Sequence, residues 1–245
     1  MMKDLAKTIG LLLSLLCALP STGHAQVPDG IDLNDGLVGY YPFSGTTLDQ
    51  SGNGNHLTPS RTEEVFGFDR NVRPLKSARL VDDNLSLKDS ENVLTGNTDF
   101  TISIWARLDG LHKKGSRKIL FASDTVNGFE LSLDKWNQGR PVPECYIGGR
   151  LVFGNILGNN ALDMPLDYWH HVILIRENDE LSLLLNNRPV AGRKTNLPIN
   201  GKGIFFGGRE KKREGEQNPN SWTGGLDDIR IYRRALSGAE LSALH

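Results

Sequence analysis

Cysteine is nearly absent from this chain of 245 residues, which contains only Cys17 and Cys145. Cys17 lies in an N-terminal segment that we expect to be removed, so Cys145 would have no partner within the molecule. This excludes the internal disulfides that hold many small secreted domains together. The fold must then be stabilised by an apolar core or by a metal ion. We expect Cys145 to be a half-buried strand thiol.

Long apolar runs are missing after the first 25 residues, which excludes a membrane-spanning helix there. The N-terminus itself combines basic Lys3 and Lys7 with an apolar run from Ile9 to Leu19 and a small-residue end, Gly23-His24-Ala25. This order predicts a secretory signal peptide over residues 1–25. The expected location is therefore outside the cytoplasm, either secreted or periplasmic.

An excess of either charge sign is also lacking, because the formal net charge is only −1. Such a balance gives the chain no general attraction to nucleic acid or to anionic membranes.

Common catalytic motifs are absent. The chain has no Gly-x-Ser-x-Gly elbow, no P-loop and no His-Glu-x-x-His, and it has no Glu-x-Asp-x-Glu array. Asp227 and Asp228 are adjacent, so in a regular strand they face opposite sides and are poorly placed for a shared acid–base task. We expect a non-catalytic binding module. A polysaccharide-acting hydrolase or lyase with dispersed acids, or a purely structural envelope protein, stays open as an alternative.

Short segments with strand patterns dominate the rest of the sequence. Residues 100–106 alternate apolar and polar side chains, the period of a strand with one buried face. Similar segments occur at 37–43, 118–122, 129–133, 169–175, 180–185, 204–206 and 226–232. Asn178-Asp179 and Asn186-Asn187 suit tight hairpin turns. This spacing predicts an all-β sandwich or barrel, with exposed loops at 58–73 and 209–220.

One helix is expected at the C-terminal end. Ser237 can cap it, and Glu240 three residues later completes a capping box. Leu236, Leu241 and Leu244 would dock this helix on the sandwich. We expect a single domain over residues 36–245, preceded by an N-terminal extension of residues 26–35.

Four motifs together resemble LamG-like (laminin-G/concanavalin A-like) jelly-roll domains. In chain order they are Tyr40-Tyr41-Pro42-Phe43 with Asp49-x-Ser51-Gly52-Asn53-Gly54-Asn55, then Phe100-Thr101-Ile102-Ser103-Ile104-Trp105, Trp169-His170-His171-Val172, and Gly225-Leu226-Asp227-Asp228-Ile229-Arg230-Ile231-Tyr232. They span roughly residues 36–244. The resemblance implies a two-sheet antiparallel jelly-roll β-sandwich with a short C-terminal helix. It also implies a lectin-like binding role, with a glycan or a cell-surface protein as partner. Asn186-Asn187 departs from the family, where Asp-Gly is common.

The loop of residues 49–55 offers candidate calcium ligands. Its glycines permit tight turns, and its Asp, Ser and Asn residues supply the oxygen donors that calcium prefers. Period-2 spacing places Asp227 on the core side of its strand, where an unpaired carboxylate needs a cation or several donors. The resemblance implies that Asp49 and Asp227 hold a structural calcium ion, with Asn53 and Asn55 as weaker candidates. The alternative is a hydrogen-bonded turn capped by Asp49.

Four tryptophans are candidates for the core or for a ligand site. We expect Trp105 and Trp169 in the core. Trp136 and Trp222 lie beside loops, where each could stack on a sugar ring or simply pack at the rim.

Two further polar features have structural explanations. His170 and His171 are adjacent, so at most one of them faces any given site, and we expect structural histidines rather than zinc ligands. Asp228 is expected at the surface as a partner of Arg230.

Overall fold

The structure is a computed structural model that describes residues 30–60, 66–87, 94, 96–109, 117–123, 128–137, 140–154, 164–199, 203–209 and 220–245. For residues 134–137 and 140 it describes the backbone alone. The predicted signal peptide lies outside these ranges. No helix in the described part of the chain is long and apolar enough to cross a membrane.

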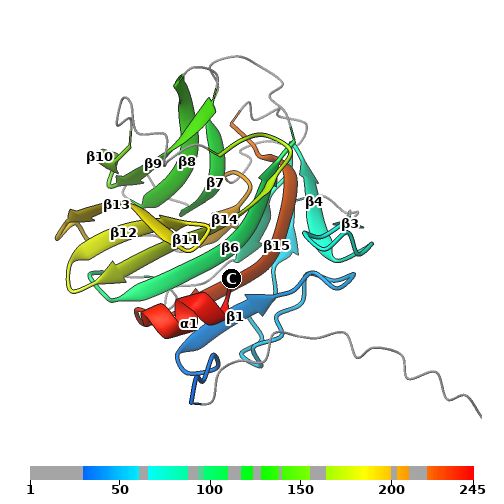
Figure 1. The fold of residues 1–245 in the computed structure, drawn as a ribbon, viewed down its shortest axis with the longest axis horizontal. Coiled ribbons are helices and arrows are strands. Elements are labelled where there is room, and N and C mark those ends of the chain that lie inside the picture. Colours follow the sequence, from blue (N-terminus) through cyan, green and yellow to red (C-terminus); the bar gives the residue numbers. More distant parts are fainter. Residues whose placement is uncertain are drawn as a thin grey trace, which may run out of the picture.

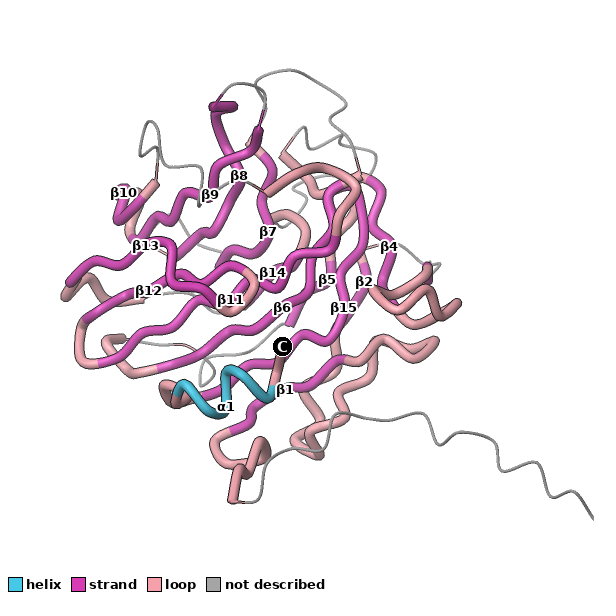
Figure 2. Tube along the Cα trace, viewed as in Figure 1, coloured by secondary structure: helices cyan, strands magenta, loops and turns pink. Residues whose placement is uncertain are grey.

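Two antiparallel sheets form the molecule (Figures 1 and 2). In spatial order the eight-stranded sheet contains β13 (Arg188–Lys194), β12 (Glu180–Leu185), β11 (Trp169–Glu177), β6 (Phe100–Leu108), β15 (Thr223–Tyr232), β4 (Ser77–Val81) and β3 (Phe66–Gly67), and β1 (Leu37–Tyr41) also pairs with β15. The seven-stranded sheet contains β10 (Arg150–Phe153), β9 (Arg140–Ile147), β8 (Phe129–Asn137), β7 (Lys118–Ser123), β14 (Ile204–Phe206), β5 (Leu85–Leu87) and β2 (Thr58–Pro59). This arrangement confirms the predicted jelly-roll sandwich. The segment 58–73, expected as a loop, contributes the short strands β2 and β3.

The main core lies between the two sheets. Ile102, Ile104 and Leu174 from the eight-stranded sheet belong to one buried cluster with Phe121 and Phe129 from the other sheet. Alternate side chains of each strand therefore point inward, as the period-2 pattern predicts. Cys145 is fully buried in this cluster, and burial raises the pKa of its thiol well above the ordinary value. The predicted strand position of Cys145 is confirmed, but the side chain is fully buried rather than half-buried.

Two hairpin turns match their sequence signals. Asn178 and Asp179 connect β11 to β12, and Asn186 and Asn187 connect β12 to β13. All four turn residues have positive φ, between 48° and 62°. Asn and Asp tolerate this left-handed geometry better than other non-glycine residues. The register of the β11–β12–β13 meander follows from these turns.

A short helix covers part of the outer face of the eight-stranded sheet. Helix α1 (Gly238–Ala243) begins after Ser237, and the capping box between Ser237 and Glu240 is present. Leu236, Leu241 and Leu244 form a second buried cluster with side chains from β11, β12 and β15. Figure 1 shows α1 beside β1, at one end of the sheet. The other end of this outer face is left to polar and aromatic side chains.

A β-bulge in β15 decides which way its acids point. The register against β6 shifts between Asp227 and Arg230, and Asp228 has a φ of 46°. One extra residue at a bulge reverses the alternation of side chains beyond it. Asp227 pairs with Trp105 and therefore faces outward, while Ile229 faces the core. This corrects the prediction that Asp227 points to the core side, because period-2 counting cannot detect a bulge.

Candidate functional site

The loop of residues 49–55 is a hydrogen-bonded turn. One carboxylate oxygen of Asp49 accepts from the backbone N–H groups of Tyr40 (2.9 Å) and Ser51 (2.8 Å). The other accepts from the Ser51 hydroxyl (2.8 Å) and the Asn55 N–H (3.0 Å). Burial opposes ionisation of Asp49, but these four donors hold the pKa of its carboxyl below the ordinary value. Asp49 thereby ties the loop to the first strand.

In this conformation the four candidate calcium ligands form bonds within the protein itself. The carboxylate of Asp49 already accepts four hydrogen bonds, which is about its full capacity. Asn53 and Asn55 turn their amide N–H groups toward the backbone carbonyls of residues 37 and 38. Asp227 binds Arg70 at 2.7 Å instead. Within the described residues no group of three or more His, Cys, Asp or Glu side chains could hold a metal ion.

We predict that Asp49→Asn lowers the free energy of unfolding by about 1–3 kcal/mol, because an amide N–H would replace one acceptor opposite backbone donors. Urea unfolding followed by tryptophan fluorescence measures this loss. Asp32→Asn is a matched control, since Asp32 is exposed and, among the described residues, accepts one backbone N–H, from Asn34. A chelator should leave the melting temperature of the wild type unchanged. A fall in the melting temperature on addition of a chelator would instead show that the protein binds a calcium ion.

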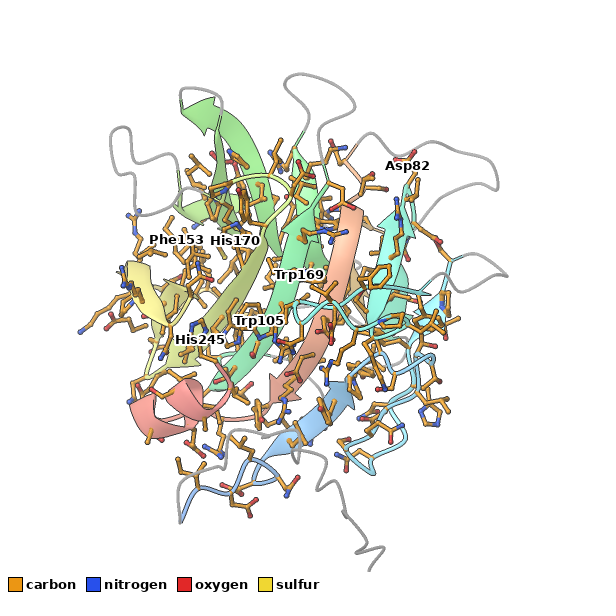
Figure 3. The ribbon with its side chains drawn as sticks, turned by 45° about the vertical axis from the view of Figure 1, so that its right-hand side comes forward. Asp82, Trp105, Phe153, Trp169, His170 and His245 are labelled. Atoms are coloured by element: carbon orange, nitrogen blue, oxygen red, sulfur yellow. The ribbon has the colours of Figure 1, made fainter. Side chains whose placement is uncertain are left out.

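Three of the four tryptophans lie in environments other than the predicted ones. Trp222 is fully buried in the main core, and its indole N–H donates to the carbonyl oxygen of Arg107 at 3.1 Å. No face of its ring is open to a ligand. Trp105 and Trp169, expected in the core, lie on the outer face of the eight-stranded sheet (Figure 3), although Trp105 is buried there. The side chain of Trp136 lies outside the described part of the chain.

Arginine and aromatic side chains alternate on this outer face. Three pairs stack: Arg230 over Tyr40 at 4.1 Å, Arg70 over Trp105 at 4.7 Å, and Arg107 over Trp169 at 5.3 Å. We name this surface, made of Tyr40, Arg70, Trp105, Arg107, Trp169, Asp227, Asp228 and Arg230, the arginine–aromatic face. Each cation–π pair contributes roughly 0.5–2 kcal/mol when partly desolvated. The pairs hold the aromatic rings in fixed orientations.

Gly225 creates the seat for Trp169. A Cβ at position 225 would lie only 2.5 Å from Cη2 of the Trp169 ring, so the ring rests directly on the backbone of β15. Arg107 pairs with Trp169 in register, and its guanidinium binds Asp109 through two hydrogen bonds of 2.6 and 3.1 Å. Trp169 is half-buried, and its neighbour Tyr168 is exposed. The result is a partly exposed ring beside fixed polar groups.

On the same outer face, the rings of Trp105, His171 and His245 stack on one another. The rings of His171 and Trp105 are parallel at a centroid distance of 4.8 Å, which is about the spacing of neighbouring strands. His245 stacks against both rings at 5.4 Å, and the Ser103 hydroxyl lies 2.8 Å from Nε2 of His171. His170 faces another way, with Nε2 3.1 Å from the carbonyl oxygen of Pro165. Neighbouring histidines thus serve separate packing roles.

Two acids of the closing strand are held by arginines. Arg70 donates to Asp227 at 2.7 Å and to Asp228 at 3.3 Å. Asp228 also accepts from Arg230 at 3.0 Å, which confirms the predicted pair, although Asp228 is half-buried rather than at the surface. Burial raises the pKa of Asp227 to about 7, although the charge of Arg70 opposes the shift. Near neutral pH the Asp227 carboxyl can therefore exist with or without a proton.

The buried His171 predicts acid sensitivity. Burial, reinforced by the positive charges of His245, Arg70 and Arg230, lowers the pKa of His171 to about 3. Neutral His171 therefore stabilises the fold fully above the unfolded pKa of about 6.5, and this contribution is lost as the pH falls toward 3. Between pH 7 and pH 5 the loss is about 2 kcal/mol.

Comparison with His171→Gln isolates this contribution, because Asp227 shifts stability in the opposite direction in both proteins. The wild type should lose about 2 kcal/mol relative to the variant between pH 7 and pH 5, measured by urea unfolding. Parallel pH profiles would show that His171 titrates normally.

The outer face of the other sheet carries a separate charged cluster. Buried Glu130 binds Arg117 at 2.9 Å and Arg209 at 2.6 Å. Burial alone would raise the pKa of Glu130, but Arg209 and Arg117 bring it below the ordinary value. Tyr146 stacks under Arg117 at 4.7 Å and donates its hydroxyl to Glu144 at 2.6 Å. These contacts leave the carboxylates engaged with the protein itself.

Arg70, Arg107 and Tyr40 were not anticipated as site residues. Arg107 could have been found, because it continues the alternation of Ser103 and Trp105 on the solvent side of its strand. Arg70 could not, because it arrives from a loop 157 residues before its partner Asp227.

Comparison with known proteins places the fold in a family. The chain is 26% identical over 239 residues to Paraclostridial mosquitocidal protein 1 of Paraclostridium bifermentans, covering 88% of this chain and 18% of that protein. The binding domain of that toxin superposes with a TM-score of 0.66 at 24% identity, over 87% of this chain and 52% of that chain. This chain thus spans a small part of its curated relative.

A second solved structure is matched over almost its whole length. It is domain 4 of AbnA, an extracellular arabinanase from Geobacillus stearothermophilus, in complex with arabinotriose. The TM-score is 0.64 and the identity 16%, over 85% of this chain and 97% of that chain. Finally, the sequence model of the concanavalin A-like lectin/glucanase superfamily matches residues 80–242. The chain therefore belongs to the concanavalin A-like lectin/glucanase superfamily.

Proposed function

We propose that this protein is an exported, non-catalytic carbohydrate-binding module and that its arginine–aromatic face holds the sugar. The observation that carries the proposal is the partly exposed Trp169 ring, seated on Gly225 beside the Arg107–Asp109 ion pair. The C–H face of a sugar packs on an aromatic ring, and its hydroxyl groups hydrogen-bond to fixed charged groups. Ligand sites typically combine apolar surface with a small number of polar groups in fixed positions.

The comparisons support a binding role. Domain 4 of the arabinanase was solved with arabinotriose, and the mosquitocidal relative is a toxin whose matched part lies in its binding domain. An arabino-oligosaccharide is therefore the first ligand to test, followed by a glycan array.

A non-catalytic role is supported by the engagement of the acids. Asp228 is shared by Arg70 and Arg230, and Asp227 is bound by Arg70. Glycoside hydrolysis uses two carboxyl groups separated by a fixed gap and free to reach the glycosidic bond. Release of reducing sugar from polymeric arabinan by the purified protein would contradict the non-catalytic assignment.

Trp169→Ala is expected to weaken arabino-oligosaccharide binding about tenfold or more, as measured by isothermal titration calorimetry, because the stacking surface is removed. Tyr146→Ala is the matched control, since Tyr146 also stacks with an arginine but lies on the other sheet. The affinity of Tyr146→Ala for the arabino-oligosaccharide should equal that of the wild type. Loss of binding in Tyr146→Ala alone would move the site to the seven-stranded sheet. Absence of any glycan ligand would favour a structural envelope role.

A further inference from the structure

Among the described residues, three of the four most exposed large apolar side chains lie in one loop. Phe68 is 55% exposed, Val72 75% and Leu75 60%. All belong to the segment of residues 68–76 between β3 and β4, which we name the β3–β4 loop. Figure 1 shows this loop at the outer edge of the molecule. Single exposed apolar residues are normal, but a group of three on one short loop requires a reason.

Hydrogen bonds within the β3–β4 loop fix the conformation of its backbone. The buried carboxylate of Asp69 accepts from the N–H groups of Asn71 (2.9 Å) and Arg73 (2.8 Å) and from Nε of Arg73 (2.6 Å). Two backbone hydrogen bonds, Asp69 to Arg73 and Val72 to Asp69, close the turn. Internal bonds therefore fix the direction in which the apolar side chains point.

The apolar residues occupy positions that the backbone does not favour for them. Val72 has a φ of 61° and Leu75 a φ of 57°. Left-handed geometry is a genuine outlier for a β-branched residue such as valine, whereas glycine or asparagine adopts it readily. Neither core packing nor backbone preference explains valine and leucine here.

Among the described residues of the loop and of β4, the charged side chains that form no ion pair are positive. Arg70 is used by Asp227, and Arg73 is used by Asp69. Lys76 and the exposed Arg79 form no ion pair with the described residues. Two cationic residues, one at the end of the loop and one in β4, thus lie close to the apolar residues in the sequence, although the chain as a whole is nearly neutral.

We propose that the β3–β4 loop is a membrane-docking element for an anionic lipid surface. Phe68, Val72 and Leu75 would enter the interface between headgroups and acyl chains, while Lys76 and Arg79 contact lipid phosphates. Apolar side chains beside basic ones are the composition of interfacial membrane anchors, and each basic residue near an anionic surface strengthens binding about fivefold. A protein partner would need a pocket for each of three projecting side chains; a lipid interface accepts them without one.

Vesicle co-sedimentation of the full chain tests the proposal. Wild type should bind phosphatidylcholine vesicles that contain phosphatidylserine, and binding should weaken as salt is raised. The double variant Val72→Asn/Leu75→Asn should bind about tenfold more weakly or worse. Its melting temperature should equal or exceed that of the wild type, because asparagine relieves the left-handed strain. Both chains keep the N-terminal apolar segment, so its contribution cancels. Because the double variant is expected to keep its melting temperature, its loss of vesicle binding cannot be attributed to unfolding.

Two further variants locate the contact. Lys76→Gln should weaken vesicle binding about fivefold, and Phe68→Trp should add a fluorescence component that shifts to the blue on vesicle addition. Equal vesicle binding by wild type and the double variant overturns the proposal, and so does the absence of wild-type binding at low salt. Because these vesicles contain no glycan, the outcome is independent of the carbohydrate titration.

Discussion

Trp222→Ala is expected to lower the free energy of unfolding by about 3–5 kcal/mol. The Trp222 side chain is fully buried in the core between the sheets. Its loss would leave a large cavity and remove the donor to the carbonyl oxygen of Arg107. Domains of this kind have a total stability of about 5–15 kcal/mol. The variant should therefore be close to unfolding at moderate temperature.

Urea unfolding measures the effect of Trp222→Ala, and Trp222→Phe should lose clearly less because most of the ring volume is kept. Trp169→Ala is the matched control: Trp169 is also a tryptophan but is only half-buried, so its loss should cost much less stability while affecting sugar binding. A Trp222→Ala protein with wild-type stability and impaired sugar binding would return Trp222 to the ligand site.

Arg176→Ala is expected to be similarly destabilising, by about 3–5 kcal/mol. Arg176 has no exposed surface. Its guanidinium donates to the carbonyl oxygens of Thr195 and Leu197, each at 3.0 Å, and to the carboxylate of Asp179 at 3.3 Å. Removal of the side chain leaves buried carbonyl groups without donors, each costing about 1–3 kcal/mol.

The reason for the large effect is that Arg176 joins strand β11 to the segment after β13. Amide hydrogen exchange should therefore show faster exchange at residues 195–199 in Arg176→Ala than elsewhere in the domain. Arg176→Lys keeps the charge but loses the planar fork, so an intermediate loss is expected. A cost below about 1 kcal/mol for Arg176→Ala would mean that water replaces the guanidinium.

Features set by neighbouring residues could be predicted from the sequence. The left-handed turns at Asn178-Asp179 and Asn186-Asn187 and the capping box of Ser237 and Glu240 depend on contacts within a few residues. The period of apolar residues likewise identified most strands and the docking of α1. Such features involve local backbone preferences, which are present before any distant contact forms.

Features that depend on long-range contacts were predicted poorly. One extra residue at Asp228 turns Asp227 outward, and a bulge has no clear signature in the alternation of side chains. Trp105 and Trp169 follow the alternation of their strands, although we expected both in the core. A stacked tryptophan can be nearly buried on an outer face when an arginine covers it. Tryptophan thus occurs both in the core and on an outer face of this protein.

The sequence by itself determined the sandwich, its turns, its terminal helix and the superfamily, because these depend on local patterns repeated along the chain. Only the tertiary structure decided the partners of the acids. Asp49 is satisfied by four donors, and Asp227 by an arginine from the β3–β4 loop. It also decided that three apolar side chains of that loop stay exposed. A carboxylate binds whichever donors the fold brings near, and that choice is made across sheets and loops rather than along the chain.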